Sequence, residues 1–491
     1  MAMTVNRGLA MRAGLWSAVE SGGLSLLSFA TLVAFSRLLS PADFGVFAIA
    51  LSTIEILALL PNMMFHDALI QRQDCEARHE GTASFLSLAM AVTICGGCWL
   101  AAPFYAQLVD DPRAGMVLAA LSIGLLFAGP VTPIVARQKR GFGYRLLAIR
   151  SLVGRLLGAG LGVAAALAGA GVWSLVIQWI AMQVLGSLVL VLTADVRPRP
   201  CFNRRAAGDL LRFGVPALAA LFATYAMRRA LMIFAGILLG AQATGMLNLA
   251  SRLVDTFWSV ACTAISQVGL STLTALRGDP LRQRHAYLQA VHLASMVFFP
   301  SFVGMAIVTP ELITVLFGAR WIEAAPLASG LALVVLVPAV RLFMPAYLTS
   351  LGKPGTLLRI NGITFVVFLV AVAAIRPVGG LLMIAILAAA ECLTIVLFAR
   401  VLMQRGGISA VDHLRAIAGP AIATSIMAAI ALPVQLWTAG HASAWLRLVI
   451  VAATGASVYI AVLAMTQPRL AQQAAHWLRA RLNGRSPELR P

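Results

Sequence analysis

The chain has 491 residues, of which 60% are hydrophobic and 11% are charged, and its formal net charge at pH 7 is +19. An ordinary soluble domain carries roughly 25% charged residues, so this composition excludes a water-soluble globular protein. The same composition is typical of a chain that lies largely within a lipid bilayer.

Apolar runs of about 20 residues, each long enough to cross a hydrocarbon core of about 30 Å as a helix, recur along the whole chain. They predict an all-α polytopic membrane protein with about 14 transmembrane helices. The predicted spans, in chain order, are 12–36, 44–64, 82–104, 115–136, 147–169, 171–193, 211–238, 246–275, 287–310, 325–348, 355–375, 380–402, 417–435 and 444–466. The connections between them are short, so a soluble catalytic domain is not expected.

The basic residues indicate how these spans are oriented. If the N-terminus lies in the cytoplasm, 26 of the 37 lysines and arginines lie on the cytoplasmic side, 5 lie outside and 6 lie within spans. This distribution follows the positive-inside rule and predicts that both termini are cytoplasmic. Orientation therefore accounts for the positive charge, and we expect no nucleic-acid partner.

The six cysteines do not indicate a metal site or a redox centre. Cys95 and Cys98 fall inside the third predicted span, in an apolar setting where a cysteine acts as a small buried hydrophobe. We expect neither a bound metal nor a cofactor.

An internal repeat appears when the sequence is shifted by 200 residues. Residues 37–50 (RLLSPADFGVFAIA) then lie over residues 237–250 (ILLGAQATGMLNLA), with Gly45 on Gly245 and Glu55 on Asp255. Six spans separate the two copies, so both halves enter the membrane in the same direction, which is a parallel repeat. The predicted organisation is an N-terminal six-helix lobe at 1–200, a C-terminal six-helix lobe at 201–405, and two additional helices with a basic cytoplasmic tail at 406–491.

Four stretches within roughly the first 260 residues carry a family pattern: 36–45 (SRLLSPADFG), 138–142 (QKRGF), 169–176 (GAGVWSLV) and 213–216 (FGVP). They resemble bacterial polysaccharide flippases of the Wzx type, in the multidrug/oligosaccharidyl-lipid/polysaccharide (MOP) exporter superfamily. The second half of the chain matches this family mainly in hydropathy. Relatives often carry an acidic residue in the middle of the seventh helix, where this chain reads MRRA at 227–230, so ion coupling through that acid is not carried over.

The resemblance implies a flippase of the bacterial inner membrane. Its substrate would be an undecaprenyl-pyrophosphate-linked oligosaccharide repeat unit, moved from the cytoplasmic to the periplasmic leaflet by alternating access for exopolysaccharide, capsule or O-antigen synthesis. Besides the lipid-linked oligosaccharide and membrane lipids, the polymerase and export proteins of the same pathway would be its partners.

Ionisable side chains within the predicted spans are candidates for function because burying them in lipid is costly. We predict that the substrate cavity is lined by arginines, whose guanidinium groups bind phosphate oxygens in bidentate fashion and stay charged at any cellular pH. These are Arg155, Arg228, Arg229, Arg252 and Arg341. The acids that could carry a proton or ion during transport are Glu55, Asp255 and Glu391.

Simpler roles for the same charges remain open at this stage. Arg252 and Asp255 are three residues apart and could form an intrahelical pair. Glu55 and Glu391 could each pair with an arginine of another helix. Arg341 lies between Pro338 and Pro345, and prolines bend helices, which indicates either a widened cavity or ordinary kinked packing.

Other functions are weighed against the flippase. A flippase for the peptidoglycan precursor lipid II would also have fourteen spans and a cationic cavity. An ion-coupled exporter of small molecules that are organic cations would need acids and aromatic rings, so the arginine excess argues against it. No enzyme activity is expected, because the outward connections, one of which carries Glu311, are short, and no GxxxxGK[ST] sequence is present. A purely structural scaffold would leave the charges within the spans without a use.

Overall fold

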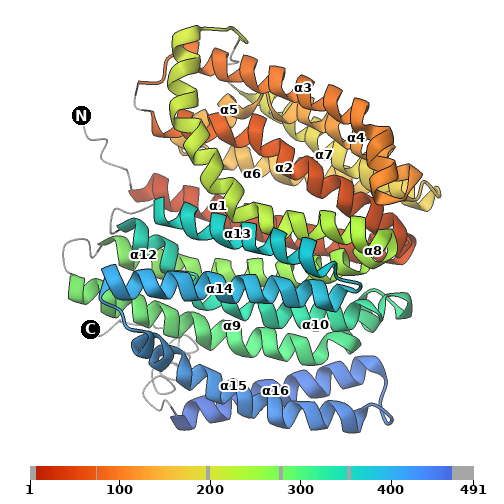
Figure 1. Ribbon diagram of the computed structural model, residues 1–491, viewed down its shortest axis with the longest axis vertical. Helices are drawn as coiled ribbons and strands as arrows, with labels where there is room; N and C mark the ends of the chain where they lie inside the picture. The colour runs from red at the N-terminus through yellow and green to blue at the C-terminus, as the bar shows by residue number, and fades with distance from the viewer. Residues whose placement is uncertain (1–6, 73, 195–198, 276–279, 351–354, 467–491) are drawn as a thin grey trace. The chain divides into compact units, whose positions relative to one another are not determined.

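The computed structural model describes residues 7–72, 74–194, 199–275, 280–350 and 355–466 (Figure 1). These residues form α-helices joined by short connections, with one short 3-10 helix and no strand. They pack as two compact units, one within residues 1–263 and 355–390 and the other within residues 264–354 and 391–491. These boundaries differ from those of the lobes expected from the repeat, which stay a prediction.

The first unit is built from the N-terminal helices, most of α8 and α13. Their bounds are α1 (Arg7–Leu38), α2 (Pro41–Gln71), α3 (Ala77–Val109), α4 (Pro112–Ala128), α5 (Thr132–Arg140), α6 (Tyr144–Leu167), α7 (Val172–Thr193), α8 (Arg204–Ala275) and α13 (Gly355–Ile375). Helix α14 (Gly380–Gly406) begins in this unit and continues into the second. The second unit also holds α9 (Pro280–Leu316), η1 (Ala319–Trp321), α10 (Ala324–Val334), α11 (Leu336–Val340), α12 (Met344–Ser350), α15 (Ala410–Thr438) and α16 (Ala444–Thr466).

Within the described ranges, 11 helices are long and apolar enough to cross a membrane, or up to 12 if the bent pair α4 and α5 forms one span. The chain is therefore a multi-pass membrane protein, and the number fourteen stays a prediction. The predicted fourteen spans and the up to 12 spans of the structure differ at two places in the chain. Helix α8 covers the seventh and eighth predicted spans, with a non-helical residue at Gly240 (φ 79°, ψ 176°), and the tenth predicted span is divided into α10, α11 and α12.

The turn between α1 and α2 is fixed by polar residues of the stretch 36–45. Ser40 caps α2, since its hydroxyl accepts from the backbone N–H of Asp43 and the Asp43 carboxylate accepts from the backbone N–H of Ser40, and Pro41 is the first helical residue. Arg113, at the start of α4, reaches Asp43 at 2.9 Å and Asp111 at 2.8 Å. Hydrogen bonds from Arg113 hold the pKa of the Asp111 carboxyl below its ordinary value.

Gly45 and Gly245 lie at a close contact between the start of α2 and the middle of α8. A Cβ atom on Gly45 would lie 1.7 Å from the carbonyl oxygen of Ala241, and one on Gly245 would lie 1.8 Å from the carbonyl oxygen of Pro41. The shift of 200 residues relates Gly45 to Gly245 and Pro41 to Ala241, so the two contacts are reciprocal. Only glycine allows two backbones to approach this closely.

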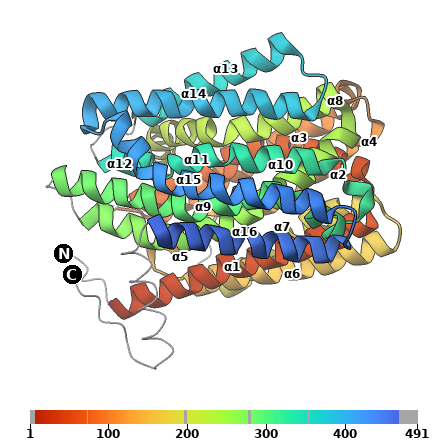
Figure 2. The same cartoon turned by 90° about the horizontal axis from the view of Figure 1, so that it is seen from below.

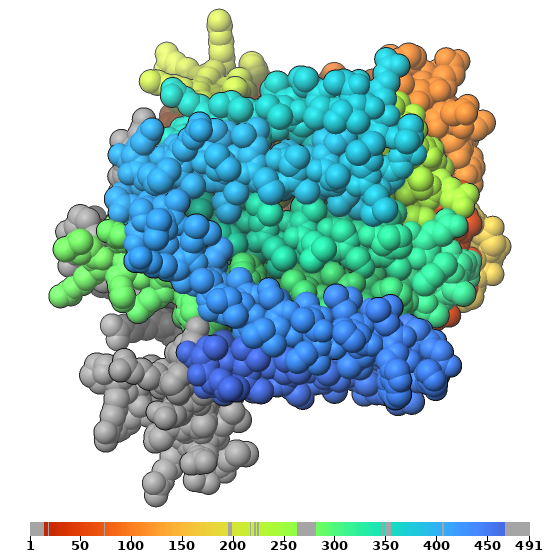
Figure 3. All heavy atoms as spheres, turned by 60° about the horizontal axis from the view of Figure 1, so that its bottom comes forward, coloured from red at the N-terminus to blue at the C-terminus, as the bar shows by residue number. Residues whose placement is uncertain are grey.

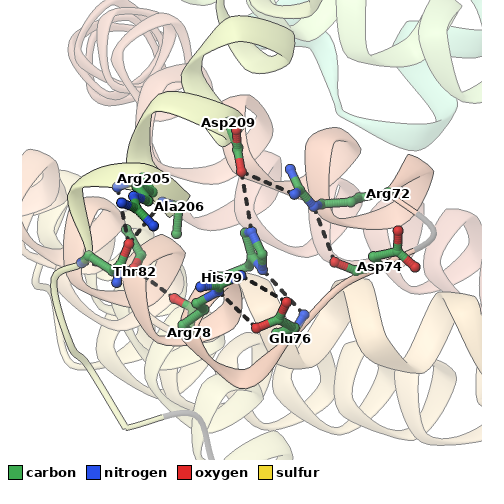
Figure 4. Close-up of polar contacts among 10 residues, drawn as sticks. Arg72, Asp74, Glu76, Arg78, His79, Thr82, Arg205, Ala206 and Asp209 are labelled. Carbon is green, nitrogen blue, oxygen red and sulfur yellow. Dashed lines mark hydrogen bonds and ion pairs between the residues drawn. The ribbon is translucent and has the colours of Figure 1, made fainter.

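The first turns of α8 are held by the connection between α2 and α3 (Figure 4). Asp209 of α8 lies 3.0 Å from Arg72, at the end of α2, and 3.6 Å from Nε2 of the buried His79 of α3. Asn203 caps α8 by accepting from the backbone N–H groups of Arg205 and Ala206, and its own N–H donates to Thr82. These bonds fix where α8 begins.

In the second unit, α15 and α16 pack against α9 (Figure 2). Polar contacts join them along the length of α9: Arg284 to Asp412 at 2.5 Å, His292 to the carbonyl of Ala416 at 2.7 Å, Tyr459 to the carbonyl of Met296 at 2.9 Å, and Gln435 to the carbonyl of Ile307 at 2.6 Å.

Helices α15 and α16, drawn in dark blue, form a continuous surface in the space-filling view (Figure 3). Both helices expose large apolar side chains, as a surface that faces lipid requires. Among these are Ile422, Ile430, Leu436, Trp437, Trp445, Val449 and Ile460.

Candidate functional site

A group of charged side chains gathers in the first unit where α8 folds back on itself, with the Arg228 and Asp255 side chains 45% and 50% exposed. Gly240 separates two helical segments of α8, with Arg228 and Arg229 before it and Arg252 and Asp255 after it. The four residues lie 11 to 15 residues from the break, or roughly 17 to 22 Å of helical rise. A reversal at Gly240 therefore brings the arginines of one segment beside the charges of the other.

Two ion pairs connect this region. Arg228 pairs with Asp255 across the two segments of α8. Arg229 lies 2.8 Å from Glu55 Oε2, which comes from α2. The angles at this second contact are not those of a hydrogen bond, so Glu55 Oε2 is buried without a hydrogen-bond partner among the described residues. Adjacent arginines thus point to separate carboxylates, as the turn of about 100° per residue requires.

The carboxylates of these pairs occupy the equivalent positions of the two aligned segments, 55 and 255. Asp255 pairs with Arg228 rather than forming an intrahelical ion pair with Arg252. Glu55 pairs with an arginine of another helix, which was one of the two roles considered for it. The sequence alone could not choose between these arrangements, because each depends on which helices are neighbours.

Arg252 and Arg155 complete the group. Arg252 donates from Nε to the side-chain oxygen of Asn248, one turn earlier, at 3.4 Å. Arg252 is attracted by the charges of Glu55 and Asp255 and repelled by those of Arg155 and Arg229. Arg155 comes from α6, and its Nε is buried with no hydrogen-bond partner in the described part of the chain. We call these six charged residues the arginine cluster: Glu55, Arg155, Arg228, Arg229, Arg252 and Asp255.

The arginine cluster carries an excess of positive charge within an apolar helical unit. Four arginines face two carboxyl groups, so at least two guanidinium groups have no counter-charge within the cluster. Guanidinium groups remain protonated even when partly buried. Such a group stabilises a ligand that brings two negative charges, above all one with oxygen atoms that accept paired hydrogen bonds.

Arg341 and Glu391 form a separate pair inside the second unit. Arg341 Nη2 donates to Glu391 Oε2 at 2.7 Å, and the side chains are 19% and 7% exposed. Arg341 directly follows α11, and α12 begins at Met344, so the helix is broken in the stretch that contains Pro338 and Pro345. This break sets the position of Arg341, and the Glu391 carboxylate on α14 neutralises its charge.

Asn248 is the polar residue of this region that the sequence analysis did not single out. It is neutral, so a search for charged residues within spans does not find it, although its side chain is buried and touches Arg252. Of the described residues, no three or more His, Cys, Asp or Glu side chains form a group that could hold a metal ion.

The model of the family described as polysaccharide biosynthesis protein matches residues 34–326. The succinoglycan biosynthesis transport protein ExoT of Rhizobium meliloti (strain 1021) is 27% identical over 73% of this chain and 72% of its own length. The teichuronic acid biosynthesis protein TuaB of Bacillus subtilis (strain 168) is 23% identical over 83% and 85%.

The lipid II flippase MurJ, in an inward closed conformation, superimposes with a TM-score of 0.78 at 11% identity, covering 93% of this chain and 99% of its own. An inward-facing multidrug resistance transporter of the MATE family gives a TM-score of 0.58 at 18% identity, covering 78% and 95%. These likenesses show a shared fold. The match over residues 34–326, more than half of the chain, places the protein in the polysaccharide biosynthesis protein family.

Proposed function

We propose that the protein is a flippase that moves an undecaprenyl-pyrophosphate-linked oligosaccharide repeat unit from the cytoplasmic to the periplasmic leaflet. The observation that carries the proposal is the arginine cluster, whose two excess positive charges match the two negative charges of a pyrophosphate diester. Guanidinium groups suit such a headgroup because they bind phosphate oxygens in pairs. The relatives named for transport in succinoglycan synthesis and for teichuronic acid synthesis support a polysaccharide substrate.

Alternating access is the mechanism that we propose for this movement. Two six-helix lobes, 1–200 and 201–405, would rock about the bound headgroup while the lipid tail stays in the bilayer. The reciprocal contacts of Gly45 and Gly245 support the parallel repeat on which this mechanism depends. In this proposal the chain has fourteen spans in the inner membrane, with cytoplasmic termini.

The energy for transport would come from a proton or ion gradient acting through a carboxylate within the membrane. Glu55 and Asp255 face arginines of the cluster, and Glu391 faces Arg341, so each carboxylate loses its counter-charge when a movement of the helices separates it from its arginine. A carboxylate left alone in an apolar setting favours its protonated form. The polymerase and export proteins of the same pathway would receive the product.

A complementation experiment tests this function. The gene is deleted and restored as wild type or as Arg228→Ala, Arg229→Ala or Arg341→Ala, with protein levels matched. We expect the deletion to lose surface polysaccharide and to accumulate lipid-linked repeat units inside, and the variants to identify the essential arginines. Normal polymer in the deletion strain, in the absence of a second flippase, would contradict the proposal.

The structural likeness to the lipid II flippase MurJ favours one second candidate, a flippase for the peptidoglycan precursor. Its substrate also carries a pyrophosphate, so the arginine cluster suits both. Depletion of the host's own lipid II flippase separates them: growth restored by this protein would favour the second candidate, and lysis with normal surface polysaccharide would favour the first. An exporter of organic cations is not favoured, because the cluster is net positive.

A further inference from the structure

The first unit holds a buried amide donor without a partner beside the arginine cluster. Asn248 is 7% exposed, and its Nδ2 has no hydrogen-bond partner among the described residues. Its oxygen accepts from Arg252 at 3.4 Å, and a guanidinium can only donate, so the oxygen must face Arg252 and the amide hydrogens must face elsewhere. Buried donors are nearly always bonded, so an acceptor atom of a ligand would satisfy this one.

The arginines of the cluster differ in how far the protein itself neutralises them. Arg228 and Arg229 are each in an ion pair with a carboxylate. Arg155 and Arg252 have no carboxylate within ion-pair distance in the described residues, and Arg155 Nε is a second buried donor without a partner. The two excess charges of the cluster therefore belong to Arg155 and Arg252.

We propose that Arg155, Asn248 and Arg252 form the subsite that holds the diphosphate of the lipid-linked substrate, and that Asn248 donates to one of its oxygens. The inference rests on the proposed function and assigns the headgroup contact to three residues of the cluster. Arg228 and Arg229 would instead hold Asp255 and Glu55 until the helices move. A headgroup that reached these residues would bind two guanidinium groups and an amide without breaking any ion pair.

This assignment explains why an asparagine lies at a position surrounded by buried apolar residues from Met246 to Ala250. Its oxygen orients Arg252, which leaves the other guanidinium nitrogens available, and its nitrogen adds a donor that a phosphate oxygen accepts. A purely structural asparagine would be expected to use both ends of its amide within the protein.

The test uses the purified full-length protein in lipid nanodiscs and a synthetic probe, farnesyl-diphospho-N-acetylglucosamine, with farnesyl monophosphate as the comparison ligand. Binding is measured for the wild type and for Arg155→Gln, Arg252→Gln, Asn248→Asp and Asn248→Leu. Arg150→Gln is the matched control, because Arg150 lies on the same helix as Arg155 but experiences the opposite charge of Glu20.

We expect each subsite variant to weaken binding of the diphosphate by about tenfold or more, as loss of a hydrogen bond to a charged group does, and the control to bind like the wild type. The Asn248 variants should also lose preference for the diphosphate over the monophosphate, while their thermal stability stays close to that of the wild type. Loss of the diphosphate preference at unchanged thermal stability separates a ligand contact from a structural role.

Two results would overturn the inference in distinguishable ways. Wild-type binding of the probe that is retained within twofold in both Asn248 variants would refute the role of Asn248 and leave the proposed function standing. The same holds if Arg228→Gln and Arg229→Gln abolish binding while the subsite variants keep it. A wild type that does not bind the probe would overturn the subsite and the proposed function together.

Discussion

Glu311 and Arg447 form an ion pair inside the second unit that ties α16 to α9. Glu311 is 2% exposed, and its carboxylate also lies 3.1 Å from the side-chain nitrogen of Gln435 on α15. One buried acid of α9 thus holds both C-terminal helices at one end of the bundle. The pair of Arg284 and Asp412 holds α15 at the other end. The two additional helices are therefore an integral part of the unit formed by α9.

Breaking this pair should destabilise the protein. Arg447→Met leaves the Glu311 carboxylate buried without its counter-charge, which we expect to cost about 3–5 kcal/mol of unfolding free energy. The double variant Glu311→Gln with Arg447→Met should recover much of the loss. Thermal unfolding of the purified protein measures both, with Arg415→Met, at an exposed position of α15, as the control. Equal unfolding temperatures for Arg447→Met and the control would contradict the prediction.

The contact of Gly45 with the backbone of Ala241 predicts that neither glycine of the repeat tolerates a side chain. A methyl group at Gly45 or Gly245 would overlap a carbonyl oxygen, so the backbones would have to separate. We expect Gly45→Ala and Gly245→Ala each to cost about 1–3 kcal/mol.

The control for this prediction is Gly97→Ala on α3, where nothing lies within 4 Å of the added atom. Fluorescence-detected gel filtration after a heat step measures the folded fraction of each variant. Gly45→Ala and Gly245→Ala should both melt below the control. A difference between the two glycine variants, with one as stable as the control, would argue against a reciprocal contact.

Hydropathy predicts which segments are membrane helices, because each apolar run must be buried in lipid or in protein wherever its neighbours lie. It does not predict how a helix is interrupted. The turn at Gly240 lies within the apolar run LLGA at 238–241, so α8 continues with a single non-helical residue in place of a polar connection. Glu311 was placed in an outward connection after Pro310. The helix instead continues through this proline to Leu316 and buries the acid against Arg447.

The charged members of the candidate site could be found from the sequence, since a charge within an apolar span is conspicuous. Their pairing could not, because it depends on which helices pack together. Glu55 is 174 residues from Arg229, and Asp255 is nearer in sequence to Arg252 than to Arg228, its partner. Asn248 has no charge to reveal it, and only its buried, unpaired nitrogen indicates a role.

A charge reversal tests the pair of Glu55 and Arg229. Glu55→Arg and Arg229→Glu should each lower transport, since each places two like charges side by side. Exchanging the residues, as Glu55→Arg with Arg229→Glu, keeps the pair and should restore transport above either single reversal. Surface polysaccharide at matched protein levels is the measurement. If the exchange is as inactive as the single reversals, one of the two residues contacts the substrate or a coupling ion directly.

The pair of Arg341 and Glu391 allows its two proposed roles to be separated. If the pair is only structural, the double variant Arg341→Leu with Glu391→Leu should retain both stability and transport, because a buried ion pair can be replaced by apolar side chains of similar size with little loss.

If Arg341 binds the substrate, the double variant should stay folded and lose transport, and Glu391→Gln alone should keep substrate binding. If Glu391 couples transport to a proton, Glu391→Gln should bind the diphosphate probe normally and lose the dependence of transport on external pH. Probe binding, polymer yield and thermal unfolding of these two variants therefore assign the pair. We expect the double variant to fold and to fail in transport. Arg341 lies at a break between α11 and α12, so the ion pair with Glu391, and not a continuous helix, fixes the position of its side chain.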